Sequence, residues 1–328
     1  MKNVVNRAPE AKKKKISVLT ACYNEEGNVE ELYRRVKAQF DALKDKYEFE
    51  HVFIDNASTD NTVAILRRMA AEDKHVKVIV NAMNFGHIRS PFYGIKQCYG
   101  DAVMMMVADL QDPPELIPEF LEKWEQGHKV VVGVKNKSKE NPLMYGIRKL
   151  FYTMVRKMSE TPLIDNFTGF GLYDKSFVDL LRETDDPYPY LRGFVAEYGG
   201  DIATVYYTQP KRQYGKTKNN FYTLWDMAML GFVNHSKVPL RLATFTGFII
   251  AGLSLLVALF YLIYKLCFWY DFQLGNAPLV IGVFFFSAVQ LIFIGILGEY
   301  IGAIHTQVRK RPLVIEKERI NFEDEDKQ

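Results

Sequence analysis

A group of acidic and amide side chains directly follows an apolar run in the first third of the chain. The run, residues 102–108, leads into Asp109-Leu-Gln-Asp and a Pro-Pro pair. This pattern is typical of a buried strand, and ligands bind at the carboxyl ends of strands in open α/β sheets. Asp109 with Gln111, and Asp112 as a third candidate, offers the hard oxygen ligands that hold Mg²⁺ or Mn²⁺ against a diphosphate. The alternative is a capped turn before a helix that begins near Glu115.

A second group of candidate side chains lies at the ends of other predicted strands and in the loops beside them. A carboxylate at a strand end, such as Asp55, suits hydrogen bonding to a base N–H or a ribose hydroxyl. Its alternative role is helix capping, which Ser58 or Asp60 could equally perform. The chain has no Gly-x-Gly-x-x-Gly or Walker-type loop, which argues against a dinucleotide or ATP phosphate cradle. The candidate nucleotide-binding residues are Thr20, Ala21, Tyr23, Glu25, Asp55, Ser58, Asn84 and Arg89.

Alternating strands and helices must position these side chains. Apolar periodicity predicts strands over residues 15–22, 50–54, 76–80 and 102–108, and helices over residues 28–43, 62–71 and 91–99. Alternation of this kind implies parallel strands joined by right-handed crossovers, with the functional loops at one edge. The predicted fold class is therefore α/β, with a mostly parallel sheet.

Two long uncharged stretches lie near the C-terminal end, at residues 242–264 and 277–297. Each is long enough to cross a hydrocarbon core of roughly 30 Å at about 1.5 Å per residue. Neither has the polar face that helices of soluble proteins usually show. Lys and Arg residues precede the first stretch and follow the second, whereas the connection at residues 268–276 carries none. The charge pattern predicts a membrane hairpin with both termini in the cytoplasm.

Composition supports a soluble domain that is followed by membrane helices. The net charge of +3 argues against a nucleic-acid-binding protein. The three cysteines are too scattered for a metal knuckle and imply no disulfide framework. We expect a basic arm (1–15), a catalytic domain (16–218), an amphipathic interfacial helix (219–240), a two-span hairpin (241–302) and a cytoplasmic tail (303–328).

Five short motifs occur in a fixed order ahead of the two spans. They are Tyr23-Asn-Glu-Glu26, Asp55-Asn-Ala-Ser-Thr-Asp60, Asn84-Phe-Gly-His87, Asp109-Leu-Gln-Asp-Pro-Pro-Glu115 and Arg212-x-x-Gly-x-Thr-Lys218, and Leu297-Gly-Glu-Tyr-Ile-Gly302 ends the second span. Over nearly its whole length the chain thus resembles the family-2 glycosyltransferases that load glucose or mannose onto bactoprenol or dolichol phosphate. The resemblance implies a GT-A fold, a nucleotide-sugar donor, Mg²⁺ or Mn²⁺ and a polyprenyl phosphate acceptor in the bacterial inner membrane.

The chain departs from the family pattern at two places. Members commonly carry Asp-x-Asp at the metal site, but the first acidic position is Val107 here. Many members also read Thr-Gly-Asp-Phe-Arg after the sheet, where this chain reads Asn166-Phe-Thr-Gly-Phe-Gly171. Asp165 or Glu197 could compensate for the missing acid.

The resemblance assigns the remaining roles. A departing diphosphate needs charge neutralisation, which a metal on Asp109 together with Arg212 and Lys218 would supply. A phosphate monoester is mostly dianionic at neutral pH and needs little help from a base, so Asp165 is expected to orient or stabilise charge. Arg212, Lys216 and Lys218 are expected to contact the acceptor phosphate, with a solvated basic loop as the alternative. In-line attack would invert the anomeric centre.

Other functions stay open at this point. A processive polysaccharide synthase would need more spans and a Gln-x-x-Arg-Trp motif, which the chain lacks. Val107 motivates the other alternative, a non-catalytic membrane scaffold or nucleotide-sugar sensor. The two-span relatives favour UDP as the donor nucleotide, with GDP open, and a homo-oligomer is possible.

Overall fold

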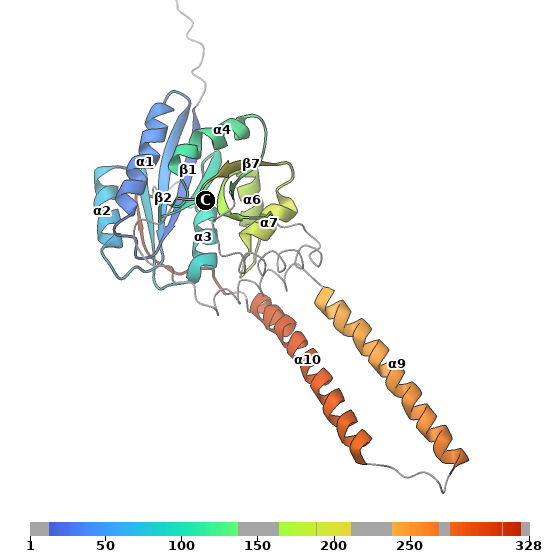
Figure 1. The fold of residues 1–328 in the computed structure, drawn as a ribbon. Helices are drawn as coiled ribbons and strands as arrows, with labels where there is room; N and C mark the ends of the chain where they lie inside the picture. Colours follow the sequence, from blue (N-terminus) through green and yellow to red (C-terminus); the bar gives the residue numbers. More distant parts are fainter. Residues whose placement is uncertain are drawn as a thin grey trace, which may run out of the picture. The chain divides into compact units, whose positions relative to one another are not determined.

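The computed structural model of the chain describes residues 13–136, 164–187, 189–210, 238–268, 276–309 and 311–322. These residues belong to two compact units. One unit contains an eight-stranded sheet with its flanking helices, and the other contains the two long helices α9 (Val238–Cys267) and α10 (Asn276–Val308) (Figure 1).

In the sheet unit, strands alternate with helices as the sequence predicts. The strands are β1 (Lys14–Cys22), β2 (Tyr47–Asp55), β3 (Val76–Asn81), β4 (Ala102–Val107), β5 (Val130–Lys135), β6 (Phe167–Asp174), β7 (Ile202–Tyr207) and β8 (Glu316–Ile320). The helices are α1 (Val29–Ala42), α2 (Thr62–Glu72), α3 (Gly86–Lys96), the short 3₁₀ helix η1 (Pro114–Leu116), α4 (Ile117–Glu125), α6 (Lys175–Glu183) and α7 (Leu191–Tyr198).

The sheet is mostly parallel, which confirms the predicted α/β fold class. Its strand order is β7-β5-β6-β4-β1-β2-β3-β8. All strands run in one direction except β6 and β8, which pair antiparallel with their neighbours. The carboxyl ends of β1, β2, β3, β4, β5 and β7 therefore share one edge, which we call the carboxyl edge.

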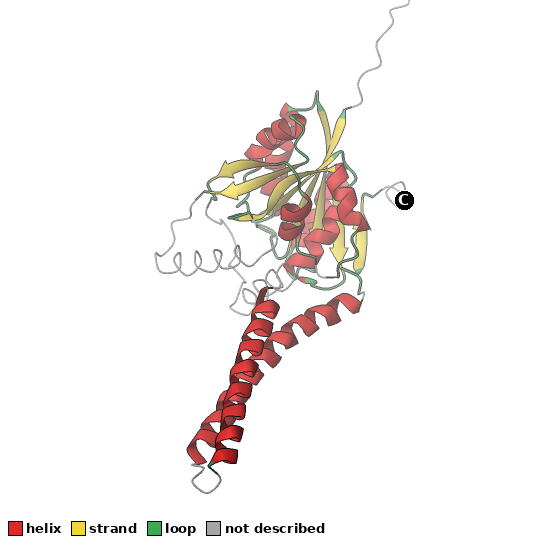
Figure 2. Cartoon of the chain, turned by 90° about the vertical axis from the view of Figure 1, so that its right-hand side faces the viewer, coloured by secondary structure: helices red, strands yellow, loops and turns green. Residues whose placement is uncertain are grey.

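Helices cover both faces of this sheet, and each face has its own apolar core. Figure 2 shows red helices on the two sides of the yellow strands. On one face α1, α2 and α4 bury side chains such as Phe40, Leu66 and Phe120. On the other face α3, α6 and α7 bury residues that include Phe92 and Phe177. Burial on both faces explains why β4, Ala-Val-Met-Met-Met-Val, consists wholly of apolar residues.

Helix α3 begins five residues earlier than the sequence analysis predicted. It starts at Gly86, and Pro91 lies inside it. The side chain of Asn84 accepts a hydrogen bond from the Gly86 N–H at 2.8 Å, which stabilises the early start. Because a proline lacks only its own N–H, the helix loses one backbone hydrogen bond at Pro91 and continues. The sequence analysis treated that proline as a helix start, which is its commoner position.

The C-terminal end of the chain contributes a strand that the sequence analysis did not predict. Within the expected tail, β8 pairs antiparallel with β3 and forms one border of the sheet. Its sequence, Glu316-Lys-Glu-Arg-Ile320, is highly charged and does not resemble a buried strand. Charged side chains are a common protection for an exposed sheet edge.

The second unit consists of two apolar helices. Within the described residues, Leu242–Tyr264 and Gly282–Val308 are long and apolar enough to cross a membrane. Their side chains lie on the surface of the unit: Leu255 is 70% exposed and Phe284 is 73% exposed. Exposure of so much apolar surface to water is unfavourable, so this surface is suited to the hydrocarbon core of a membrane. The prediction of two apolar C-terminal helices is confirmed.

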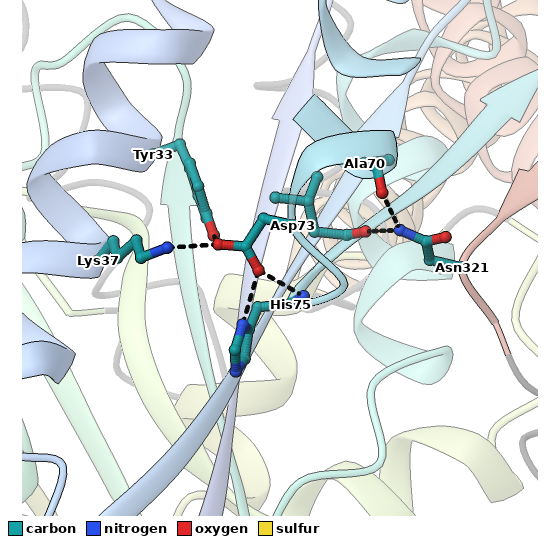
Figure 3. A network of polar contacts seen from close by, with 7 residues as sticks. Tyr33, Lys37, Ala70, Asp73, His75 and Asn321 are labelled. Carbon is teal, nitrogen blue, oxygen red and sulfur yellow. Dashed lines mark hydrogen bonds and ion pairs between the residues drawn. The ribbon is translucent and has the colours of Figure 1, made fainter. Parts of the chain in front are cut away.

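A polar network lies at the opposite edge of the sheet, between α2 and β3 (Figure 3). Asp73 accepts hydrogen bonds from the Tyr33 hydroxyl at 2.7 Å, from Lys37 at 2.5 Å and from the His75 ring at 2.7 Å. Its pKa lies well below the usual value, because these donors outweigh the effect of partial burial. The network joins α1 to the turn between α2 and β3.

A histidine lies in the core beneath this network. His51 is fully buried on β2, with its ring stacked on Phe53 at 4.0 Å between centroids and its Nε2 2.9 Å from the Thr20 hydroxyl. Burial lowers the pKa of His51 to about 3, so the folded state holds a neutral ring at neutral pH.

The buried histidine predicts acid sensitivity. An unfolded histidine titrates near pH 6.5, so between roughly pH 6.5 and 3 the unfolded chain binds the extra proton. Stability is therefore lost as the pH falls through this window, by an amount on the order of a few kcal/mol. We expect His51→Gln to show a smaller drop in melting temperature between pH 7 and pH 4.5 than the parent in detergent. The control His128→Gln removes an imidazole that pairs with the exposed Asp201, and equal drops in all three proteins would contradict the prediction.

Candidate active site

The loops after β1 and β2 are joined by hydrogen bonds at the carboxyl edge. Asn24, which adopts a φ of 57°, accepts a hydrogen bond from the Thr59 N–H at 2.7 Å and donates its own N–H to Ser58 at 2.8 Å. The Glu25 N–H donates to the Thr62 hydroxyl at 2.9 Å. The two loops are therefore held as one unit before any ligand binds.

Asp55 lies at the centre of these loops, at the last position of β2. Its carboxylate accepts hydrogen bonds from the N–H of Ser58 at 2.9 Å and from the Ser58 hydroxyl at 2.5 Å. Burial raises the pKa of Asp55, while the two bonds from Ser58 act in the opposite direction. Asp55 and Ser58, both predicted to bind the nucleotide, are thus brought together, and Ser58 fixes the orientation of the Asp55 carboxylate.

The amide side chains beside Asp55 belong to the scaffold. Asn56 donates to the Asn84 side-chain oxygen at 2.9 Å and accepts from the Phe85 N–H at 2.9 Å. Asn81 donates to Asn56 at 3.2 Å. Asn84, a predicted nucleotide-binding residue, therefore uses its side-chain oxygen to hold the loop between β3 and α3.

The other predicted nucleotide-binding residues occupy different environments. Tyr23 and Glu25 are half-buried in the loop after β1, and Glu25 accepts a hydrogen bond from the Asn28 amide at 2.6 Å. Thr20 is fully buried with its hydroxyl against His51, so its side chain serves the core. Ala21 packs against the core, and Arg89 donates to the carbonyl of Pro312.

The predicted metal-binding residues form a tight turn after β4. Asp109 accepts a hydrogen bond from the Gln111 N–H at 3.1 Å, across Leu110, whose φ is 61°. Leu110 is buried and pins the turn to the core. The Gln111 side chain donates to the carbonyl of Pro210 at 3.4 Å. Val107, at the position where the family resemblance leads us to expect an acid, is 38% exposed.

Asp112, the third metal candidate, has a structural role. It is 2% exposed and accepts hydrogen bonds from the Tyr207 hydroxyl at 2.9 Å and from the Val107 N–H at 3.2 Å. Burial raises the pKa of Asp112 to about 6, and Tyr207, the Val107 N–H and the charge of Lys135 oppose this rise. Both oxygens are engaged inside the protein, so Asp112 holds the turn that presents Asp109.

Two basic residues near this turn, Lys135 and Arg192, were missed by the sequence analysis. Lys135 ends β5 and is half-buried; burial lowers its pKa, while Asp112 and Asp109 raise it. The positive charge of Arg192, near the start of α7, acts on both Lys135 and His87 and lowers their pKa values further, after the effect of burial. The strand-end rule that singled out Asp109 applies equally to Lys135, which follows the run Val130-Val-Val-Gly-Val134.

The structure separates the two residues that could replace the missing acid. Asp165 is exposed in the turn before β6, and β6 begins opposite the last residues of β5, at the carboxyl edge. Glu197 lies near the end of α7, where its neighbour Tyr198 lines a cavity of about 260 Å³ together with Gly127 and Asp201, at the opposite edge. Of the two, Asp165 alone lies at the edge that carries Asp109.

The predicted phosphate-binding residues Arg212, Lys216 and Lys218, and most of the expected interfacial helix at residues 219–240, lie outside the described residues. Pro210 is the last described residue before them, and its carbonyl accepts the hydrogen bond from Gln111.

The turn after β4 fits a divalent cation that is shared with a diphosphate. Within the described ranges, no group of three or more His, Cys, Asp or Glu side chains could hold a metal ion. Mg²⁺ and Mn²⁺ do not require such a group, since one or two carboxylates suffice when substrate phosphates and water complete the shell. Asp109, with the amide of Gln111, would hold the ion there.

Comparison with known proteins agrees with this fold. The model of the glycosyl transferase family 2 matches residues 17–181. An uncharacterised glycosyltransferase of Bacillus subtilis, YkcC, is 32% identical over 309 residues, which are 94% of this chain and 95% of that protein. A prophage-derived bactoprenol glucosyl transferase of Shigella flexneri is 34% identical over 304 residues, which are 92% of this chain and 97% of that protein.

Solved structures also show similarity to part of this chain. Glucosyl-3-phosphoglycerate synthase from Mycobacterium tuberculosis, in complex with Mn²⁺, UDP and phosphoglyceric acid, superposes with a TM-score of 0.47. It is 17% identical, and the match covers 67% of this chain and 76% of that one.

The mostly parallel sheet with polar loops at its carboxyl edge, the two membrane-length helices and these relatives together identify a membrane-associated transferase of the GT-A type. The chain belongs to glycosyl transferase family 2. This confirms the resemblance seen in the sequence and the predicted enzyme class, a hexosyltransferase.

The position of Lys135 generates a prediction with a matched control on the same strand. Lys135 ends β5 beside the Asp109 turn, whereas Lys129 precedes β5 and pairs with Asp174 at 3.2 Å. We expect Lys135→Ala to lower kcat/KM for sugar transfer by about 100-fold or more, because a developing charge then lacks a fixed cation. Lys129→Ala should stay within about threefold of the parent, since Lys129 lies at the opposite end of β5 and Asp174 keeps its hydrogen bonds from Trp124 and the Ser176 N–H. Similar rates in the two variants would exclude Lys135 from the site.

Proposed function

We propose that this enzyme transfers a hexose from a nucleoside diphosphate sugar, with UDP as the favoured nucleotide, to a polyprenyl phosphate such as undecaprenyl phosphate. The reaction would invert the anomeric centre. The observation that carries the proposal is the presence of opposite charges at the carboxyl edge: the Asp109 turn follows β4, and Lys135 ends β5. A sugar diphosphate needs both a metal ligand and a fixed cation.

The donor nucleotide would bind over the loops after β1 and β2. Asp55 is fully buried with each oxygen bonded to Ser58, so it would accept a hydrogen bond from a base or a ribose through a remaining lone pair; the half-buried Tyr23 and Glu25 lie in the adjoining loop. Asp109 and Gln111 would hold Mg²⁺ or Mn²⁺, which neutralises the diphosphate when bound. The solved structure of the Mycobacterium enzyme contains Mn²⁺ and UDP, a metal and a nucleotide of the kinds proposed here.

The transfer step requires little from the protein beyond position and charge. A phosphate oxygen of the acceptor attacks C1 of the sugar, the bond from C1 to the diphosphate oxygen breaks, and the nucleoside diphosphate leaves with the electron pair. Lys135 and Arg192 would stabilise phosphate charge at this edge, together with Arg212, Lys216 and Lys218 from the basic loop. Asp165 would orient the acceptor.

The membrane helices supply access to the acceptor. A polyprenyl chain stays in the bilayer, so its phosphate can be reached only by a catalytic domain held at the surface. The distribution of Lys and Arg around the spans favours a cytoplasmic catalytic domain in the bacterial inner membrane. The bactoprenol glucosyl transferase of Shigella flexneri, similar over nearly its whole length, supports this acceptor class.

Two candidate spans in the described residues support this proposal over a processive synthase, which needs a channel. Purified full-length enzyme incubated with undecaprenyl phosphate and UDP-glucose, UDP-N-acetylglucosamine or GDP-mannose would test the proposal. Formation of a lipid-linked sugar from one donor, with the anomer opposite to that of the donor, is the expected outcome. Polymer growth would favour the synthase, and no transfer from any donor would favour a sensor.

The metal role predicts a strong effect of one isosteric change. Asp109→Asn removes the main anionic ligand at nearly constant volume, so we expect transfer to fall by about 1,000-fold or more with Mg²⁺ or Mn²⁺. The melting temperature should stay close to that of the parent. Glu119→Gln, an exposed change on α4, is the control and should retain full activity. Turnover of Asp109→Asn within tenfold of the parent would remove the metal from this turn.

A further inference from the structure

After the second apolar helix the chain returns to the sheet unit through residues 311–322, which we call the C-terminal segment. Within it β8 pairs with β3, from Val78 opposite Ile320 to Asn81 opposite Glu316. The pairing continues past the end of β3, where the Ala82 N–H donates to the Ile315 carbonyl at 2.8 Å. The segment therefore lines the start of the β3–α3 loop, residues 82–85.

The far end of the segment is anchored to the other edge of the sheet. Asn321 donates its side-chain amide to the carbonyls of Ala70 at 2.6 Å and Val76 at 2.9 Å (Figure 3). Arg319 donates to the Gln97 side chain at 2.8 Å. The C-terminal segment is therefore held at both ends and along β3, and we call this set of contacts the brace.

Arg89 joins the near end of this brace to helix α3. Its guanidinium donates to the Pro312 carbonyl at 2.5 Å and lies 5.6 Å from the ring centroid of Phe85. The Nε atom of Arg89 is buried and has no hydrogen-bond partner within the described residues. Val314, two residues beyond Pro312, is 6% exposed and fixes the segment through apolar contact. Arg89 is thus directed toward the C-terminal segment.

The loop held by this brace touches the residue that follows Asp55. The Phe85 N–H donates to Asn56 at 2.9 Å, and Asn56 donates in turn to Asn84 and, at 3.1 Å, to the Gly86 carbonyl. Contacts therefore run from Pro312 through Arg89 and Phe85 to Asn56. A shift of the loop would move Asn56 and, with it, the adjacent Asp55.

We propose that the C-terminal segment positions the donor site, and that Arg89 is a positioning residue that acts through Pro312 and Asn56 without touching the nucleotide. The inference rests on the proposed function, because Asp55 is taken as the residue that binds the donor. It gives the residues after the second span a role in nucleotide affinity, where the sequence indicates only a charged tail.

The test compares full-length variants that loosen the brace at different points. Binding of UDP and of GDP with Mn²⁺ is measured by calorimetry, and hydrogen exchange is followed by mass spectrometry over residues 82–89. Arg89→Ala should weaken nucleotide binding about tenfold and speed exchange in the loop, with kcat at saturating donor within about threefold of the parent. Val314→Ala removes no polar group, so any effect on nucleotide binding must be indirect. This variant should shift affinity and exchange in the same direction as Arg89→Ala. Arg89→Lys should recover part of the loss, since an ammonium can still donate to the carbonyl.

The matched control is Arg67→Ala. It removes an exposed ion pair between Arg67 of α2 and Glu318 of β8, and it should leave binding and exchange unchanged. Parental affinity in Val314→Ala, combined with weak binding and unchanged exchange in Arg89→Ala, would show that Arg89 is a direct ligand and overturn the inference. A parent that binds neither nucleotide would overturn the proposed function instead. In that case exchange at residues 82–89 still decides whether the segment holds the loop.

Discussion

The site depends on one topological constraint, the insertion of antiparallel β6 between the parallel strands β4 and β5. Neighbouring strands lie about 4.8 Å apart, so this insertion separates the ends of β4 and β5 by about 10 Å. The insertion therefore places the Asp109 turn and Lys135 on either side of the start of β6. It also brings Asp165, which precedes β6, to the same edge.

The difference in burial between two nearby carboxylates explains why Asp109 can face substrate whereas Asp112 cannot. Asp112 is buried, so it must have hydrogen-bond donors, and Tyr207 and the Val107 N–H supply them. The bond to Val107 closes the turn from the end of β4, and Leu110 fills the core beneath it. Asp109 is thereby held half-buried at the edge, even though the first acid of the usual pair is absent.

The C-terminal segment changes how the membrane part of the chain relates to catalysis. The two apolar helices lie between β7 and β8 in the sequence, so the sheet is completed only after the chain has formed both. Removal of everything after β7 would expose the edge of β3 and free the loop beside Asp55, as well as delete the hairpin. The hairpin is therefore an insertion into the catalytic unit in terms of chain order.

The sequence by itself determined the alternating strands and helices up to Val107, the two apolar helices and the positions of Asp55 and Asp109 at strand ends. These features are local, since each follows from hydrophobic period, a turn signal or an uncharged length. Only the tertiary structure decided which polar residues face the site. Thr20 turns into the core toward His51, Asp112 turns toward Tyr207 and Asn84 turns toward Asn56, because partners far away in the sequence satisfy them. The same holds for β8, whose place depends on strand order, a non-local property that residue spacing does not encode.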